Sequence, residues 1–283
     1  MAKKINFCAD ANKFATFENS PFCIIPFGYE KTTSYMKGTK NGPKALLEAS
    51  ERLEPFDEQF KVTAAEKGVF SFGINQKKEI ALANIDKALA GNKFPIILGG
   101  EHTITPMAFG RFSKKYGKLN YLVFDAHADL KDEYMGSKWS HACATRRVYD
   151  LTKNIALVGI RSINSEESKF MDDNHIPVYY PYRRDMMAAL DVVSSLDPSL
   201  PLYISFDLDG LDPSVMPGVG TPEPGGLSWY EAISLLDAAF KTYNVVGFDC
   251  VELMPLKNSI VSDFIAAKLV YKAMALKIKY GRY

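Results

Sequence analysis

Short continuous apolar runs recur along the chain, and each is followed by a longer stretch in which apolar positions repeat every three or four residues. Runs of this kind, without alternation, are typical of strands that are buried on both faces of a parallel sheet. The sequence predicts seven such strands, at about residues 23–26, 95–98, 121–124, 155–160, 178–180, 202–206 and 245–248.

The stretches between these runs have helical periodicity. Pro43 stands in an expected first helical turn, and Ser228 precedes WYEAISLLDAAF as a candidate N-cap. Alternating strands and helices predict an α/β fold, a three-layer α/β/α sandwich with a mostly parallel central sheet. The predicted helices cover residues 43–53, 78–90, 104–116, 164–174, 184–195, 228–241 and 260–278.

The composition is that of an ordinary globular protein. Of the 283 residues, 47% are hydrophobic, which is enough for a sizeable core, and we see no linker, charge block or internal repeat. We therefore predict one domain spanning residues 1–283. The 34 basic residues nearly balance the 33 acidic ones, which argues against a nucleic-acid surface or a polybasic membrane patch.

The cysteines and the start of the chain indicate a compartment. No apolar run approaches the roughly 20 residues that span a bilayer, and MAKKINFCADANKF lacks the apolar core of a secretory signal. The four cysteines, Cys8, Cys23, Cys143 and Cys250, are scattered without a CxxC pair. Free thiols in a reducing cytoplasm are therefore expected.

Two connections are longer than usual for such a fold, from Asp129 to about Asn154 and from Gly210 to Leu227. Long ordered loops in α/β proteins tend to carry function. Ligands of open α/β sheets bind beyond the carboxyl ends of the strands. The three polar clusters of this chain all follow such ends, so the functional site is expected there.

The first polar cluster is FDAHAD (124–129), which completes the apolar strand YLVF. If the segment stays extended, Asp125, His127 and Asp129 project to one side, separated by alanines too small to block a ligand. A polar strand end that faces solvent is the alternative. Three candidate ligands at a spacing of two make that alternative the weaker one.

Two further clusters follow other predicted strands. SFDLDG (205–210) again places two carboxylates, Asp207 and Asp209, at a spacing of two, and GGEHT (99–103) carries His102 after paired glycines that permit a sharp turn. A lone histidine is weak evidence by itself. Several unpaired carboxylates at one edge of a sheet, however, would be costly without a cation between them.

Together the clusters supply six candidate metal ligands. Oxygen donors with imidazole, and without thiolate, suit Mn²⁺ better than a structural zinc site, and four carboxylates match the charge of two divalent ions. Such ions, typically ~3.5–4 Å apart, would hold a bridging hydroxide as the nucleophile of a hydrolase. Calcium is the alternative, but imidazole is a poor Ca²⁺ ligand and the sequence has no EF-hand loop. The six are His102, Asp125, His127, Asp129, Asp207 and Asp209.

The order of these motifs resembles that of the ureohydrolases, the family of arginase, agmatinase and relatives. The resemblance covers most of the chain and implies a mostly parallel α/β/α fold, two Mn²⁺ ions per subunit on the same six positions, and homo-oligomers, trimers or hexamers. It also implies hydrolysis of a guanidinium group to urea and an amine. The motifs are GGEHT, FDAHADL, SHACATRRV (140–148), SFDLDGLDP, GTPEPGGLS (220–228) and DCVELMP (249–255).

The resemblance adds two catalytic positions. His141 matches the family's loop histidine, which would protonate the strongly basic leaving amine, with Asp129 helping to shuttle that proton. Glu252 matches the acidic residue that pairs with the guanidinium, whose planar fork can donate two parallel hydrogen bonds to one carboxylate. Without the family pattern, a surface histidine and a partner for a core arginine would be the better interpretations.

The choice of guanidino substrate depends on the loop after Asp129 and on the run around Glu223. KDEYMGSKWS (131–140) lacks the polar pattern with which arginases bind an α-carboxylate, and GTPEPGG is similar to agmatinases. The resemblance therefore implies agmatine, a small cationic substrate cleaved to putrescine and urea, with Glu223 in substrate binding. The alternatives are guanidinobutyrate, aminopropylagmatine, arginine, or a catalytically silent relative that binds metal.

Three residues near this loop have no assigned role. Lys131 could meet a carboxylate or face solvent. Trp139 could wall the pocket or pack at a subunit contact. Cys143 stands where the family varies.

Overall fold

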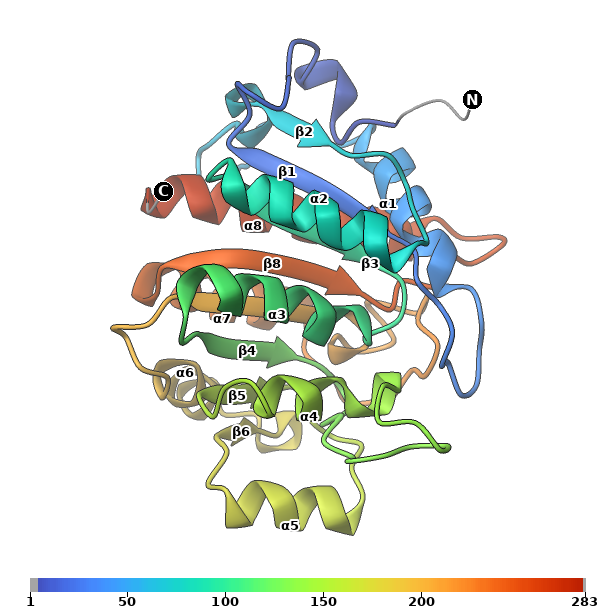
Figure 1. Cartoon of the computed structure of the whole chain (residues 1–283), viewed down its shortest axis with the longest axis vertical. Helices are drawn as coiled ribbons and strands as arrows, with labels where there is room; N and C mark the ends of the chain where they lie inside the picture. The colour runs from blue at the N-terminus through green and yellow to red at the C-terminus, as the bar shows by residue number, and fades with distance from the viewer. Residues whose placement is uncertain (1–4, 282–283) are drawn as a thin grey trace.

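The computed structural model describes residues 5–281, which contain one eight-stranded sheet. Every neighbouring pair of strands is parallel, in the order β2-β1-β3-β8-β7-β4-β5-β6 (Figure 1). The parallel sheet that the apolar runs predict is therefore confirmed. The strands are β1 (Phe22–Phe27), β2 (Val69–Ser71), β3 (Phe94–Gly99), β4 (Asn120–Phe124), β5 (Ile155–Val158), β6 (Val178–Tyr179), β7 (Leu202–Asp207) and β8 (Val245–Val251).

β2 is the strand that the sequence pattern misses. It has three residues and pairs only with β1, at the edge of the sheet. A run of that length is too short to show a period. β5 ends at Val158, earlier than predicted, and Gly159 leaves the strand with a φ of +103°.

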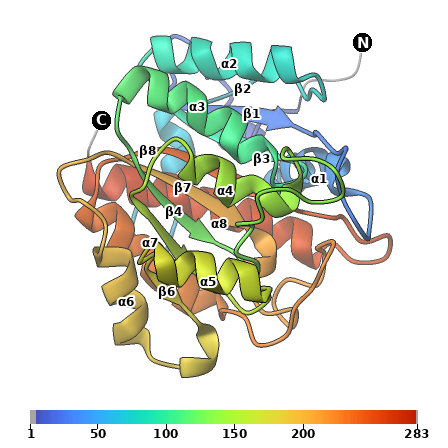
Figure 2. The same cartoon turned by 60° about the horizontal axis from the view of Figure 1, so that its bottom comes forward.

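Helices cover both faces of the sheet. α2, α3, α4 and α5 lie on one face, and α1, α6, α7 and α8 lie on the other, as Figures 1 and 2 show. Each face has its own hydrophobic core, so the predicted three-layer sandwich is confirmed. The helices are α1 (Gly42–Ser50), α2 (Lys78–Ala90), α3 (Ile104–Tyr116), α4 (Ala144–Tyr149), α5 (Ser165–Asp173), α6 (Met186–Ser194), α7 (Trp229–Thr242) and α8 (Val261–Tyr280).

The connection after Asp129 is not the continuous loop that the sequence predicts. It contains the 3-10 helix η4 (His141–Cys143) and then α4, which packs against α3. The buried residues of α4 are Ala144, Thr145 and Val148, and Val148 alone belongs to the hydrophobic core, so the helix has no hydrophobic stripe. A six-residue helix of this kind leaves almost no periodic signal in the sequence.

The strands all point the same way, so their carboxyl ends lie at one edge of the molecule. The connections that follow β1, β3, β4, β7 and β8 begin at this edge, on the right of Figure 1. No helix within residues 5–281 is both long and apolar enough to cross a membrane.

Candidate metal centre and substrate cavity

A cavity of about 360 Å³ lies at the carboxyl ends of the strands. His102 and Asp125 are almost fully buried, each 1% exposed, and contact carboxylates or imidazoles of its lining. The structure thus brings together residues that follow or end four different strands, β3, β4, β7 and β8. The predicted site residues that line the cavity are His127, Asp129, His141, Asp207, Asp209 and Glu252.

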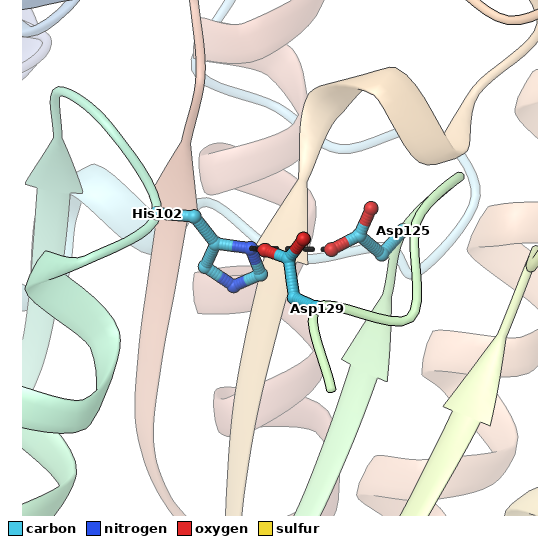
Figure 3. Close-up of side chains that lie close together, drawn as sticks. All are labelled: His102, Asp125 and Asp129. Atoms are coloured by element: carbon cyan, nitrogen blue, oxygen red, sulfur yellow. Dashed lines mark ion pairs between the residues drawn. The ribbon is translucent and has the colours of Figure 1, made fainter. Parts of the chain in front are cut away.

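Two overlapping groups of three side chains could each hold a metal ion. His102, Asp125 and Asp129 form the first (Figure 3), and Asp125, His127 and Asp209 form the second, with the ligand atoms of each group within 4.8 Å of one another. His102 Nδ1 is 3.1 Å from an oxygen of both Asp125 and Asp129. Because Asp125 belongs to both groups, its carboxylate can bridge two ions.

Asp207 lies beside the first group, with its Oδ2 3.3 Å from His102 Nδ1. Burial raises the pKa of Asp207 well above its usual value, and the charges of Asp209 and Asp125 raise it further. Burial lowers the pKa of His127, but the charges of Asp209 and Asp125 and the hydrogen bonds to both carboxylates together outweigh burial and raise this pKa to about 12. The cluster therefore concentrates negative charge that divalent cations would balance.

Two buried atoms indicate where a metal fits. Within the described part of the chain, His102 Nδ1 and Asp125 Oδ2 are buried and have no hydrogen-bond partner. Buried polar atoms without a partner are costly, and a divalent cation that both atoms coordinate would remove this cost. Oxygen donors combined with imidazole suit ions such as Mn²⁺. The residues present therefore fit a binuclear metal centre.

A buried chain of hydrogen bonds sets the tautomer of His102. The Ser205 hydroxyl donates to Asp249 Oδ1 over 2.6 Å, so its oxygen accepts from His102 Nε2, 3.0 Å away. Thr105 and Tyr203 also donate to this fully buried Asp249 carboxylate. Neutral His102 then carries its proton on Nε2, which leaves Nδ1 free to bind a metal.

We expect Ser205→Ala to weaken Mn²⁺ binding by roughly 10- to 100-fold, the usual result of removing the partner of a metal-binding histidine. Calorimetric titration of the metal-free protein measures the affinity. Ser195→Ala, which removes an exposed hydroxyl bonded to Val192 O, is the matched control. Equal affinities in the two variants would show that this hydrogen-bond chain does not orient His102.

The aspartates converge for a different reason than the predicted alternation along an extended strand. β4 ends at Phe124, and Asp129 adopts a left-handed φ of +50°. Asp209 lies in the 3-10 helix η6 (Leu208–Gly210), which Asp207 caps by accepting a hydrogen bond from the Asp209 N–H. Turns, rather than an extended backbone, therefore aim these carboxylates into the cavity.

The paired glycines at the end of β3 stand where the chain bends, as the sequence suggests, and they also permit close approach. Neither Gly99 nor Gly100 has a positive φ. A Cβ on Gly100 would collide with Tyr29 O, and a Cβ on Gly99 would lie 2.6 Å from Val251 Cγ1. Glycine at both positions lets the chain that carries His102 pack directly against the ends of β1 and β8.

Glu252 follows β8 with a left-handed φ of +64°, a conformation that is costly for a residue other than glycine. Its N–H donates to Gly100 O over 2.8 Å, and its Oε1 accepts from the His102 N–H over 2.7 Å. Burial raises the pKa of the Glu252 carboxyl to about 8. A carboxyl group fixed beside the candidate metal ligands in this way can bind a planar cation, whose charge favours the ionised form of the group.

His141 begins η4 and is held by the segment that follows β1. Its backbone N–H donates to Thr32 Oγ1 over 3.0 Å, and that hydroxyl donates to the buried carboxylate of Glu101 over 2.9 Å. Its Nε2 lies 3.3 Å from Ser34 Oγ, and its ring stands edge-on to that of Tyr134. An imidazole thus shares the cavity with the candidate metal ligands, and such a group can act as a proton donor.

Glu223, like the buried His102 and Asp125, is a predicted site residue that is not among the described residues lining the cavity. Its Oε1 accepts from Ser162 Oγ over 3.1 Å and lies 4.0 Å from His127 Nε2. Arg161 anchors the Glu223 carbonyl, so the side chain reaches the outer nitrogen of a candidate metal ligand. The role of Glu223 in substrate binding therefore stays a prediction, and its side chain contacts two residues of the cavity lining, Ser162 and His127.

Arg161 is a residue of the site that the sequence analysis misses. Its backbone N–H donates to Ala126 O, between two candidate ligands. Its side chain joins the segments after β5 and β7 to the loop that carries Glu223. The only signal in the sequence is an arginine after a buried strand, which is weak. The guanidinium donates to the carbonyls of Gly159, Asp209, Gly210, Leu211, Glu223 and Pro224.

Arg161→Lys is expected to destabilise the protein by about 3 kcal/mol. The carbonyls are arranged around a planar guanidinium, and the single ammonium of lysine cannot donate to all of them. Several buried carbonyls would therefore lose their hydrogen-bond donors. Urea unfolding of the purified protein measures the change. Arg183→Lys, at an exposed arginine over the ring of Tyr180, is the matched control. A loss no larger than that of the control would contradict a role for Arg161 in joining the loops.

The residues without an assigned role have distinct environments. Lys131 lines the cavity with its Nζ 3.9 Å from Glu167 Oε2, so it does not simply face solvent. Trp139 is half exposed, lies outside the set of described cavity residues, and has Lys78 over its ring. All four cysteines, Cys143 included, are free, as the sequence predicts, and the structure buries them.

Comparison with known proteins identifies the family. The Arginase family matches residues 20–276. The chain belongs to this family. N(1)-aminopropylagmatine ureohydrolase of Synechocystis sp. is 35% identical to this arginase-family chain, over 94% of the chain and 92% of the relative. Agmatinase of Pyrococcus horikoshii is 32% identical, over 93% of the chain and 94% of the relative.

Solved structures agree with the sequence relatives. The crystal structure of agmatine ureohydrolase of Thermoplasma volcanium matches with a TM-score of 0.86 at 29% identity, covering 100% of this chain and 97% of that one. An agmatinase-like structure from Clostridium difficile matches with a TM-score of 0.83 at 30% identity, covering 92% and 98%. The predicted membership of the ureohydrolases, and with it the enzyme class, is confirmed.

Proposed function

We propose that this arginase-family enzyme hydrolyses agmatine to putrescine and urea with two Mn²⁺ ions per subunit. The observation that carries the proposal is the pair of ligand groups that share Asp125, with Glu252 and His141 in the lining of the same cavity. The agmatinase of P. horikoshii and the agmatine ureohydrolase of T. volcanium support agmatine as the substrate.

The two ions would be held by four carboxylates and two imidazoles. This donor set, without thiolate, favours Mn²⁺. When bound, the ions activate the water that attacks the guanidinium carbon. Glu223, whose Oε1 lies 4.0 Å from His127 Nε2, contributes to substrate binding beside this ligand. The ligands are His102, Asp125, His127, Asp129, Asp207 and Asp209.

Glu252 orients the guanidinium. The His102 N–H uses one lone pair of Oε1 and keeps the carboxylate in place, so the remaining lone pairs are available to the substrate. Two parallel N–H bonds from the planar guanidinium to this carboxylate hold the central carbon toward the metal ligands.

His141 protonates the leaving amine. The free amine anion is too basic to depart, so a ring nitrogen of His141 transfers a proton to it as the C–N bond breaks. Thr32 fixes the backbone of His141, and Ser34 lies beside its Nε2. Asp129 lines the same cavity and relays a proton toward His141.

Aminopropylagmatine is the second candidate substrate. The relative from Synechocystis sp., at 35% identity, is named for it. The cavity lining includes Tyr35 and Met36, and Tyr35 is 75% exposed. This open end gives a longer polyamine tail a route toward solvent.

Urea release from a panel of guanidino compounds with Mn²⁺ tests the substrate. We expect the highest kcat/KM with agmatine among agmatine, aminopropylagmatine, 4-guanidinobutyrate and arginine. A preference for 4-guanidinobutyrate or arginine would overturn the substrate assignment. No urea from any compound, with metal stoichiometrically bound, would favour the catalytically silent relative.

We also propose that residues 1–283 act as one ureohydrolase unit that assembles into trimers or hexamers and works in the cytoplasm in polyamine biosynthesis. Family resemblance supports the assembly, and the free cysteines support a reducing compartment. Light scattering of the purified protein is expected to give the mass of three or six chains, and a single-chain mass would contradict the assembly.

A further inference from the structure

Lys131 is the only lysine or arginine among the described residues that line the cavity, where five carboxylates face it. Three of those carboxylates are candidate metal ligands, and Glu252 is assigned to the guanidinium. Glu167 and Lys131 therefore remain as the charged groups available to the rest of the substrate. The five are Asp129, Glu167, Asp207, Asp209 and Glu252.

Glu167 is a rigid acceptor. It is only 3% exposed, and it is the N3 residue of the capping box that begins α5. Its Oε1 accepts from the Leu130 N–H over 3.0 Å, and its Oε2 accepts from the Asn164 N–H over 3.1 Å. Two backbone donors from different segments prevent the carboxylate from turning away from the cavity.

The Lys131 ammonium stands between this carboxylate and an aromatic ring. Its Nζ is 3.9 Å from Glu167 Oε2 and 4.8 Å from the centroid of the Tyr134 ring. The Tyr134 ring also stands edge-on to the ring of His141, with centroids 6.0 Å apart. A carboxylate on one side and an aromatic ring on the other form a binding site for an alkylammonium group.

We propose that Lys131 determines the specificity for the substrate's tail. In the free protein its ammonium lies over Tyr134 and against Glu167, which is the position that the ammonium of the tail takes when the substrate binds. This inference rests on the proposed function and assigns an alkylammonium to the end of the substrate remote from the guanidinium. The 3.9 Å separation is too long for a hydrogen bond, and the Lys131 side chain is 31% exposed. It can therefore turn to solvent as the tail enters.

Competition between the Lys131 ammonium and the substrate's tail affects binding differently for each class of tail. A cationic tail must displace Lys131, so the lysine weakens its binding. An uncharged tail gains nothing from Glu167 and does not require the displacement. A carboxylate tail meets the fixed negative charge of Glu167 wherever Lys131 points.

Lys131→Met tests the proposal, since methionine keeps an apolar stem over Tyr134 and removes the charge. The substrates are agmatine and butylguanidine, which share the guanidinium and the four-carbon chain but differ in the terminal ammonium. We expect the ratio of KM for butylguanidine to KM for agmatine to rise about tenfold, the scale of one partly desolvated cation contact. Lys131→Arg keeps a cation and should keep the wild-type ratio.

Lys169→Met is the matched control, because it removes an exposed lysine that pairs with Asp173 on α5. It should leave the ratio unchanged. An unchanged or lower ratio in Lys131→Met overturns the proposal. An equal loss with both substrates also overturns it, because such a loss indicates a structural role through Glu167.

Failure of the proposed function is distinguishable from failure of this inference. If the wild-type protein releases no urea from either compound, the proposed function fails. Calorimetric binding of agmatine and butylguanidine to the Mn²⁺-loaded protein then supplies the same comparison. A tenfold gain for agmatine in Lys131→Met supports the assignment of Lys131, and an unchanged ratio of affinities overturns it.

Discussion

Replacing Asp125 with asparagine is expected to remove bound metal and urea release together, lowering kcat by at least ~10³-fold. Removal of one electrostatic group from an active site costs ~10²–10³-fold, and Asp125 belongs to both ligand groups, so its loss affects both ions. An amide supplies a weaker, uncharged donor. The metal content of the purified variant and urea release from agmatine are the two measurements.

The metal-free form of this variant gives an independent check. Asp125 repels Asp207 but also pairs with His102 and His127, so these effects oppose each other and its neutralisation should change the melting temperature of the metal-free protein little. The increase in melting temperature that Mn²⁺ produces in the wild type should be lost. Asp173→Asn, at an exposed aspartate on α5, is the matched control. A variant that keeps both ions and full activity would show that Asp125 is not a shared ligand.

Glu252→Gln is expected to lower kcat/KM by roughly 10²–10³-fold while metal content stays at the wild-type level. Breaking a buried ion pair by removing one partner costs about 3–5 kcal/mol, and the amide cannot accept two parallel N–H bonds. Glutamine keeps an oxygen for the His102 N–H, so the backbone of the metal site is preserved. Steady-state kinetics with agmatine and elemental analysis separate the two effects.

Glu166→Gln, at an exposed glutamate of α5, is the matched control for this change. If Glu252→Gln lost metal in proportion to activity, the residue would act on the metal site rather than on the guanidinium. Wild-type kinetics in the variant would exclude the guanidinium contact altogether.

The fold was predictable because its elements leave periodic signals. The strands of a doubly covered parallel sheet are continuously apolar, and long helices such as α2 and α3 begin and end where the pattern places them. The elements that escaped prediction, β2 and α4, are too short to show a period. Their positions depend on tertiary contacts, with β1 for the strand and with α3 for the helix.

The sequence predicts which residues form the site better than it predicts how their side chains are oriented. The motifs bring Asp125, Asp129 and His102 together, but positive φ at Asp129 rather than strand alternation aims that carboxylate. The contacts of Arg161 are with backbone carbonyls, which carry no residue identity and therefore no sequence signal. Asp249 is different, since a carboxylate inside the apolar strand VVGFDCV is a signal that could have singled it out, although the sequence analysis did not use it.

The tail of the substrate is the part of the site that the motifs leave open. From the sequence alone, Lys131 could be either a partner for a carboxylate or a surface residue. Its position between Glu167 and Tyr134 depends on α5, which begins more than thirty residues further along the chain. Such a contact between distant segments is visible only in the folded structure.

The most direct test of the two-metal account is a titration of the chelator-treated protein with Mn²⁺, with urea release from agmatine as the readout. We expect no urea from the metal-free protein and full activity once two ions are bound per chain. Full activity in the metal-free protein, or saturation of activity with a single ion per chain, would contradict a binuclear centre built on Asp125.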